Sequence, residues 1–307
     1  MPKSLEPSKA TEIKFRAGIT LEQGFVTIAR NCLKQMRANE AGLRGSVDPE
    51  FVHQMRVGLR RLRSGLSLFK PWIALPPGLA DEIEWLSQSL GKARDAEVLA
   101  ATTLPALIAA CPDESLNALQ KAALTLARRR RRAAVLALNS ARYRTLMGRL
   151  EQWLKAAAWR ADCPCQEELD AELAPAAASM LRRRKKKMQA CAMALQEQAG
   201  GDARHRLRIA VKKLRYATEF FRSIEAKKAI ARLARLSDLQ ELLGQLNDAE
   251  VARTLLLDLG QAQASLLAPA AFARGVLWAQ SQQQIAHLGP LLRGPVPDQE
   301  RPALRAH

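Results

Sequence analysis

The chain has 307 residues, 48% of them hydrophobic, so it can enclose a sizeable core. Its 48 Lys and Arg exceed its 30 Asp and Glu by a formal net charge of +18, which favours a strongly anionic partner: nucleic acid, a phosphate polymer or an acidic membrane surface. Aromatic residues make up only 5%, which disfavours recognition of bases by stacking, and the charged N-terminus excludes a signal peptide.

Helical periodicity extends along almost the whole chain, and Gly and Pro residues separate segments of helical length. We therefore expect an all-α fold. Residues 1–17 are predicted to form an N-terminal extension, 18–161 a first helical bundle half, 166–288 a second, and 289–307, rich in Pro and charge, a mobile tail. The longest apolar stretch, Val98 to Cys111, is too short to cross a bilayer.

A row of basic residues follows a helix start at Asp48-Pro49-Glu50. On a helix its members lie within roughly 80° of one face and extend about 15 Å. No acidic residue follows before Pro71, so the row predicts anion binding in preference to an ordinary solvated face. Arg61, like Lys213 at the corresponding place in the second half of the chain, points away from its row and is a weaker candidate. The row consists of His53, Arg56, Arg60 and Arg63.

The segment Leu90-Gly91-Lys92-Ala93-Arg94-Asp95-Ala96-Glu97-Val98 comes next. A Gly inside a helix predicts a close helix approach at Gly91. We expect Asp95 to pair with the basic row and orient it, because a single Asp-Ala-Glu is too little for metal-dependent phosphoryl chemistry. Helix starts are also expected at Asp113-Glu114, ahead of five consecutive arginines, 128–132, of which Arg128 and Arg132 share a face.

Both features recur in the second half of the chain. A second basic row lies 152 residues after the first, and Leu243-Gly244-Gln245-Leu246-Asn247-Asp248-Ala249-Glu250-Val251 matches the segment at Leu90. Six consecutive cations, 182–187, precede this row, with Arg183 and Lys187 on one face. These matches predict an internal duplication. The second row and its neighbours are His205, Arg208, Lys212, Lys213 and Arg215.

The two histidines head the two rows, which favours phosphate contact over a role as helix caps. No cysteine or acid accompanies either histidine at ligand spacing, so we expect no metal site and no cofactor. The odd number of cysteines, five, and the absence of a second Cys/His pair near Cys163 and Cys165 predict reduced thiols in the cytoplasm.

The helix His-x-x-Arg-(apolar)-x-(apolar)-(Lys/Arg)-(Lys/Arg)-Leu-Arg, present at His53 and His205 and followed each time by Leu-Gly-x-x-x-Asp-x-x-Val, resembles the CHAD family, named for its conserved histidine α-helical domain. The resemblance covers residues 18–288. It implies two pseudo-symmetric four-helix bundles that form one body and bind inorganic polyphosphate through basic residues between them. Many family members carry a CYTH domain with a Glu-x-Glu-x-Lys signature. Residues 1–17 are too few for one, which indicates a stand-alone member.

The predicted function is non-enzymatic binding of polyphosphate in a basic groove, at polyphosphate granules in the cytoplasm. The predicted contacts include Arg61 and the basic runs, and Asp95 and Asp248 support them. Two alternatives stay open: a nucleic-acid binder, and a hydrolase of phosphate polymers or triphosphates. Membrane association would need an apolar strip beside the cations, which packing removes. The predicted binding residues are His53, Arg56, Arg60, Arg61, Arg63, Arg128, Arg132, Arg183, Lys187, His205, Arg208, Lys212, Lys213 and Arg215.

Overall fold

The computed structural model describes residues 5–163, 165–198 and 200–293, and this part of the chain is helical, without a β-sheet. The all-α prediction is confirmed. A π-helical turn, Leu99–Thr103, joins the helix Leu79–Val98 to the helix Leu104–Ala110. The helices are α1 (Leu21–Gly45), α2 (Pro49–Phe69), α3 (Leu79–Val98), α4 (Leu104–Ala110), α5 (Ser115–Asn139), α6 (Ala141–Ala156), α7 (Gln166–Asp170), α8 (Leu173–Glu197), α9 (Gly201–Phe220), α10 (Ala226–Ala262) and α11 (Leu267–Arg293).

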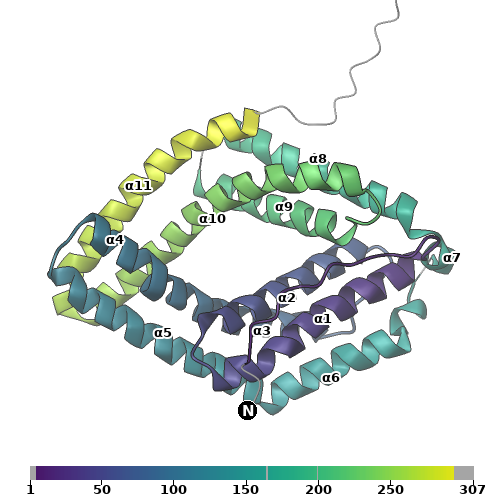
Figure 1. Ribbon diagram of the computed structural model, residues 1–307, viewed down its shortest axis with the longest axis horizontal. Coiled ribbons are helices and arrows are strands. Elements are labelled where there is room, and N and C mark those ends of the chain that lie inside the picture. Colours follow the sequence, from purple (N-terminus) through teal and green to yellow (C-terminus); the bar gives the residue numbers. More distant parts are fainter. Residues whose placement is uncertain (1–4, 164, 199, 294–307) are drawn as a thin grey trace, which may run out of the picture.

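The helices pack in a corresponding order in the two halves of the chain (Figure 1). In the first half α1 packs on α2, α2 on α3, and α3 on α5. In the second half α8 packs on α9, α9 on α10, and α10 on α11. The halves meet through matching pairs, α1 with α8, α2 with α9, α3 with α10 and α5 with α11. The internal duplication itself stays a prediction from the sequence.

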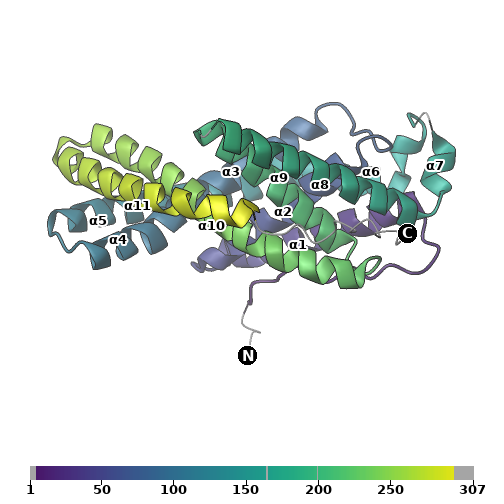
Figure 2. The ribbon, with the colours of Figure 1, turned by 90° about the horizontal axis from the view of Figure 1, so that it is seen from above.

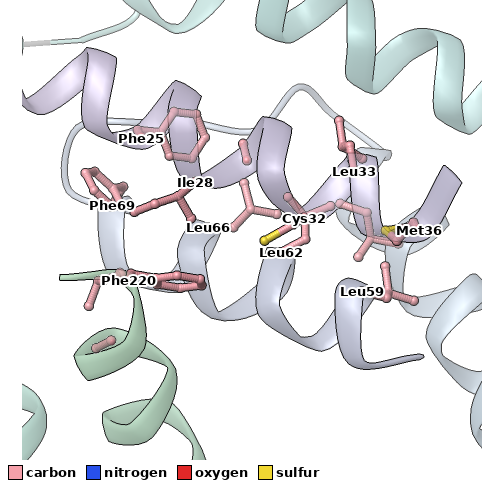
Figure 3. Close-up of a cluster of buried hydrophobic side chains, with 14 of the residues drawn as sticks. Phe25, Ile28, Cys32, Leu33, Met36, Leu59, Leu62, Leu66, Phe69 and Phe220 are labelled. Carbon is pink, nitrogen blue, oxygen red and sulfur yellow. The ribbon is translucent and has the colours of Figure 1, made fainter. Parts of the chain in front are cut away.

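Two clusters of buried apolar side chains hold the molecule together, and each draws on both halves. The larger combines α1, α2 and α6 with α8, α9 and the first part of α10, and Figure 3 shows Phe25 and Phe69 of the first half beside Phe220 of the second. The smaller joins α4 and α5 to the end of α10 and to α11, which lie together at one end of the molecule (Figure 2). The two halves therefore share their cores.

Helix starts agree with the capping residues in the sequence. Asp48 caps α2 by accepting a hydrogen bond from the Glu50 backbone N–H at 2.8 Å, with Pro49 in the first turn, as predicted. Near the other predicted start, α5 begins at Ser115, whose N–H donates to Asp113 at 2.8 Å. These caps satisfy amides that the helix leaves without partners.

Two glycines allow α1 and α2 to pack closely. A Cβ at Gly42 would lie 2.0 Å from the Phe51 ring. One at Gly58 would lie 2.9 Å from Met36 Cγ and 3.3 Å from the Cys32 carbonyl oxygen. Larger residues at these positions would push the two helices apart.

The end of the chain differs from the predicted tail boundary. Helix α11 continues through Pro290 to Arg293, so it includes the first residues of the segment 289–307. The remainder, 294–307, lies outside the described residues. All five cysteines are free thiols. Along the described ranges, no helix has both the length and the apolar character needed to cross a bilayer.

Candidate functional site

The structure brings the two basic rows together. Helices α2 and α9 pack side by side near the middle of the molecule (Figure 1), and their cations line two adjoining concavities. One, of about 200 Å³, opens toward α3 and α10, and the other, of about 460 Å³, opens toward Ser64, Ser67 and Tyr216. We call the two together the basic groove. Four residues line both parts, and we call them the central cations: Arg56, Arg60, Arg208 and Lys212.

Three of the central cations have no carboxylate partner in the part of the chain that the structure describes. Among the described residues, none forms an ion pair with Arg60, Arg208 or Lys212, and the buried Nε atoms of both arginines lack a hydrogen-bond partner. Burial, together with the nearby charges of Arg208, Arg60 and Arg56, lowers the pKa of Lys212 to about 7. The groove thus holds positive charge that the protein itself leaves largely unbalanced, which favours an anionic ligand.

The fourth central cation is held by an aspartate. Arg56 Nη2 lies 3.6 Å from Asp95 Oδ1, and Asp248 lines the same side of the groove. Burial raises the pKa of Asp95; Arg56 opposes this shift and Asp248 adds to it. Asp95 therefore pairs with the first basic row from α3, Asp248 lines the groove from α10, and the supporting role of the two aspartates stays a prediction.

The glycines in the repeated segments have a different role from the predicted one. A Cβ at Gly91 would meet only the Arg56 guanidinium, at 3.7 Å, and one at Gly244 would meet nothing within 4 Å. The prediction that Gly91 allows a close helix approach is therefore wrong. Gly244 instead lines the groove and leaves open space beside the central cations.

The two histidines occupy different surroundings. His53 is half-buried and lines the groove beside Arg94, and burial followed by the charge of Arg94 lowers its pKa. His205 is exposed and lines the opposite part of the groove. Arg94 is a groove residue that the sequence analysis missed, although the residue stands in the first repeated segment directly before Asp95.

Arg63 and Lys213 both line the part of the groove that opens toward Ser67, and the charge of Arg63 contributes, after burial and Arg184, to the lowered pKa of Lys213. Arg63 also pairs with Glu84 at 2.6 Å. Glu84 reaches Arg63 from the separate helix α3, and the sequence analysis missed it because it considered only acids on the same helix and Asp95. Arg215 pairs with Glu219 at 2.8 Å and does not line the groove.

Arg61 is not available to a ligand. Its side chain is 4% exposed and donates to Asn31 Oδ1 at 2.9 Å and to Gln35 Oε1 at 3.1 Å. Its guanidinium also lies over the Phe220 ring, 5.3 Å from the centroid. The residue therefore connects α1, α2 and α9 in the interior, and the prediction that it contacts the ligand is wrong.

The two basic runs differ in position. Arg183 and Lys187 line a further concavity that shares Ser67 with the groove, and Arg184 donates to the Ser67 carbonyl oxygen at 2.9 Å. Arg128 and Arg132 are exposed on α5 and line no part of the groove. The structure thus places Arg183 and Lys187 next to the groove, whereas the predicted contacts Arg128 and Arg132 lie outside its lining.

Other arginines of the first run serve the fold. Arg131 pairs with the buried Glu97 at 3.0 Å, and Arg130 lies near enough to Asp95 to oppose the rise in its pKa. Among the described residues, no three His, Cys, Asp or Glu side chains gather in a way that could hold a metal ion.

Comparison with known proteins identifies the family. A model of the CHAD domain matches residues 27–257, a range that contains both basic rows and both repeated segments. The chain belongs to the CHAD family. The crystal structure of the CHAD domain from the plant Ricinus communis superposes with a TM-score of 0.83 and 36% sequence identity, over 95% of this chain and 98% of that one.

Other relatives of this CHAD protein add less about function. PptA from Streptomyces chartreusis shares the fold with a TM-score of 0.62 at 16% identity, over 89% of this chain and 98% of that one. Two uncharacterized Mycobacterium tuberculosis proteins, MT2285 and Rv2226, are 30% identical over 239 residues, which cover 75% of this chain. The match spans 44% of the length of those proteins.

Proposed function

We propose that this protein binds inorganic polyphosphate in the basic groove and leaves the polymer chemically unchanged. The observation that carries the proposal is the meeting of the central cations from α2 and α9, three of them without a carboxylate partner among the described residues. Guanidinium groups match phosphate oxygens with forked donors, and a lysine adds a compact charge. Membership of the CHAD family agrees with this ligand.

The chemistry of the groove favours a phosphate chain over a nucleic acid. Among the described lining residues, Tyr216 is the one Phe, Tyr or Trp, and the other rings are the imidazoles of His53 and His205, so the groove has little surface on which bases can stack. A polyphosphate carries about one negative charge per phosphate, so cations one helical turn apart can engage several phosphates together. The expected ligand is therefore recognised by its charge spacing.

The central test removes the central cations. Arg56→Ala, Arg60→Ala, Arg208→Ala and Lys212→Ala are combined in one variant, and binding of long-chain polyphosphate is measured by mobility shift or filter retention at about 0.15 M salt. We expect affinity to fall at least about a hundredfold, because charge-assisted hydrogen bonds contribute roughly 1.5–3 kcal/mol each.

A control variant removes four charges elsewhere. Lys121, Arg128, Arg129 and Arg132, all exposed on α5, are replaced by Ala together. If binding depended only on net charge, both variants would lose affinity equally, and the groove would not be the site. Circular dichroism on both variants shows whether the helices are retained.

Two measurements distinguish polyphosphate binding from the alternative functions, nucleic-acid binding and hydrolysis. Duplex or single-stranded DNA that displaces polyphosphate at equal charge would favour a nucleic-acid ligand. Release of free phosphate from polyphosphate, with or without Mg²⁺, would show a hydrolase. We expect neither, because the groove's carboxylates are Asp95 and Asp248, and Asp95 is held by Arg56.

Binding of this kind would direct the protein to polyphosphate granules in the cytoplasm. A fluorescently tagged chain should then co-localise with stained granules, while the variant without the central cations should spread through the cell. Equal localisation of both would show that another surface directs the protein.

A further inference from the structure

Another concavity, of about 450 Å³, adjoins the basic groove. It lies between α9, α10 and α11, and it shares His205 and Arg208 with the groove. Its volume falls within the range of small-molecule sites, roughly 300–1,000 Å³. We call it the indole pocket, and its principal lining residues are Arg204, His205, Arg208, Arg253, Trp278 and Gln282.

Trp278 distinguishes this pocket from the groove. Its side chain is 53% exposed although it lines a concavity. The four other tryptophans each contact another ring or a guanidinium group, whereas no described ring or cation stacks on Trp278. An indole left open inside a cationic concavity offers a stacking surface for a flat ring.

A row of cations leads from the indole pocket into the groove. Arg204, Arg208 and Lys212 are spaced four residues apart on α9, so they lie one helical turn apart over about 12 Å. Arg204 lines the indole pocket, Lys212 lines the groove, and Arg208 lines both. A ligand with a flat ring at one end and a chain of phosphates at the other fits this sequence of surfaces.

Polar side chains complete the pocket. The amides of Asn247 and Gln282 and the hydroxyl of Ser281 lie in the lining, where they can meet the polar edge of a ring. Two carboxylates also line the pocket: Glu250 pairs with Arg253 at 2.7 Å, and Asp202 stands in the first turn of α9. The pocket thus suits a nitrogen-rich aromatic ring better than a purely hydrophobic one.

From this geometry we infer that the protein binds a nucleoside triphosphate, with its base stacked on Trp278 and its phosphates on Arg204, Arg208 and Lys212. Since Arg208 and Lys212 are also central cations, the nucleotide and polyphosphate exclude each other. The exclusion rests on the proposed function, whereas nucleotide binding itself does not.

The test separates the base from the phosphates. The full chain is titrated with ATP and with inorganic tripolyphosphate by calorimetry at about 0.15 M salt without added metal. We expect ATP to bind about tenfold more tightly, because stacking of the base adds to the phosphate contacts. Trp278→Ala should remove this preference and leave the affinity for tripolyphosphate unchanged, while Trp278→Phe should keep most of it.

Several outcomes would overturn the inference. One is equal affinity for ATP and tripolyphosphate in the wild-type chain, and another is an unchanged preference for ATP in Trp278→Ala. A third is a single-stranded oligonucleotide that binds through Trp278 with higher affinity than ATP at equal charge. Long-chain polyphosphate provides the independent check. The Trp278→Ala variant should still bind long-chain polyphosphate. If the wild-type chain bound ATP but not polyphosphate, the proposed function would be refuted and the nucleotide site would stand.

Discussion

The protonation of Lys212 should respond to binding of the proposed polyanion. Lys212 stands among Arg56, Arg60 and Arg208, and Asp248 is the acid that partly offsets them. A lysine with a pKa of about 7 is only partly protonated in the free protein at neutral pH. A bound polyanion favours the ammonium form, so its pKa must rise on binding, and binding takes up a proton.

We therefore expect the affinity for long-chain polyphosphate to be greatest near pH 6 and to fall between pH 7 and 9. The contribution of Lys212 is fully present below its free pKa of about 7 and is lost as pH rises through the higher pKa of the complex. Each unit of that rise changes affinity about tenfold. The measurement is a binding series in non-phosphate buffers.

Lys212→Met is the control for this pH dependence. It should bind more weakly and lose the fall between pH 7 and 9, and it should fold at least as stably, because burial and the neighbouring arginines disfavour the charge that it removes. His53, whose pKa lies below its ordinary value, titrates at lower pH in the free protein. An unchanged pH dependence in Lys212→Met would show that another group is responsible.

At the scale of the helices, similar glycines serve different purposes. Gly58 lies where α2 packs on α1, and Gly244 lies in α10 beside open space in the groove. From helix propensity alone, both glycines destabilise their helices by the same amount relative to alanine. What decides is whether a Cβ added at each position would clash with a neighbouring helix, as it would at Gly58 but not at Gly244.

Gly58→Ala and Gly244→Ala should therefore shift stability in opposite directions. Gly58→Ala should destabilise the protein by roughly 1–3 kcal/mol, because its Cβ would press on Met36 and on the Cys32 carbonyl. Gly244→Ala should stabilise it by up to about 1 kcal/mol through helix propensity. Urea denaturation of both variants measures the difference, and a destabilised Gly244→Ala would show that α10 packs more tightly there than its open surroundings indicate.

The sequence predicted the elements better than their contacts. Capping at Asp48 and the periodicity of the basic rows identified the helices and the face that carries Arg56 and Arg60. The sequence could not place Glu84 next to Arg63, since that contact depends on how α3 packs on α2. Nor could it show that Arg61, one residue from Arg60, is buried against α1 and Phe220.

At the scale of the whole molecule, the net charge of +18 opposes compactness by self-repulsion. We expect the melting temperature to rise with salt in the free protein, because ions screen this repulsion. Long-chain polyphosphate should raise it further, by a stabilisation of about 2.7 kcal/mol at a hundredfold excess over Kd. Differential scanning fluorimetry measures both effects.

The variant without the central cations separates these two effects. It should still respond to salt, because most of the surface charge remains, but it should lose the additional stabilisation by polyphosphate. Full stabilisation of that variant by polyphosphate would place the ligand on another part of the surface.

Helix α10 has a mechanical consequence. This single helix of 37 residues enters the larger apolar cluster at Leu236, passes the groove at Asp248 and reaches the smaller cluster at Leu256. It connects the two apolar clusters, and the basic groove lies beside its middle. A polymer bound to α2 and α9 would lie beside the middle of α10. Local unfolding at either end of the molecule should then weaken binding of the polymer, and bound polymer should oppose that unfolding.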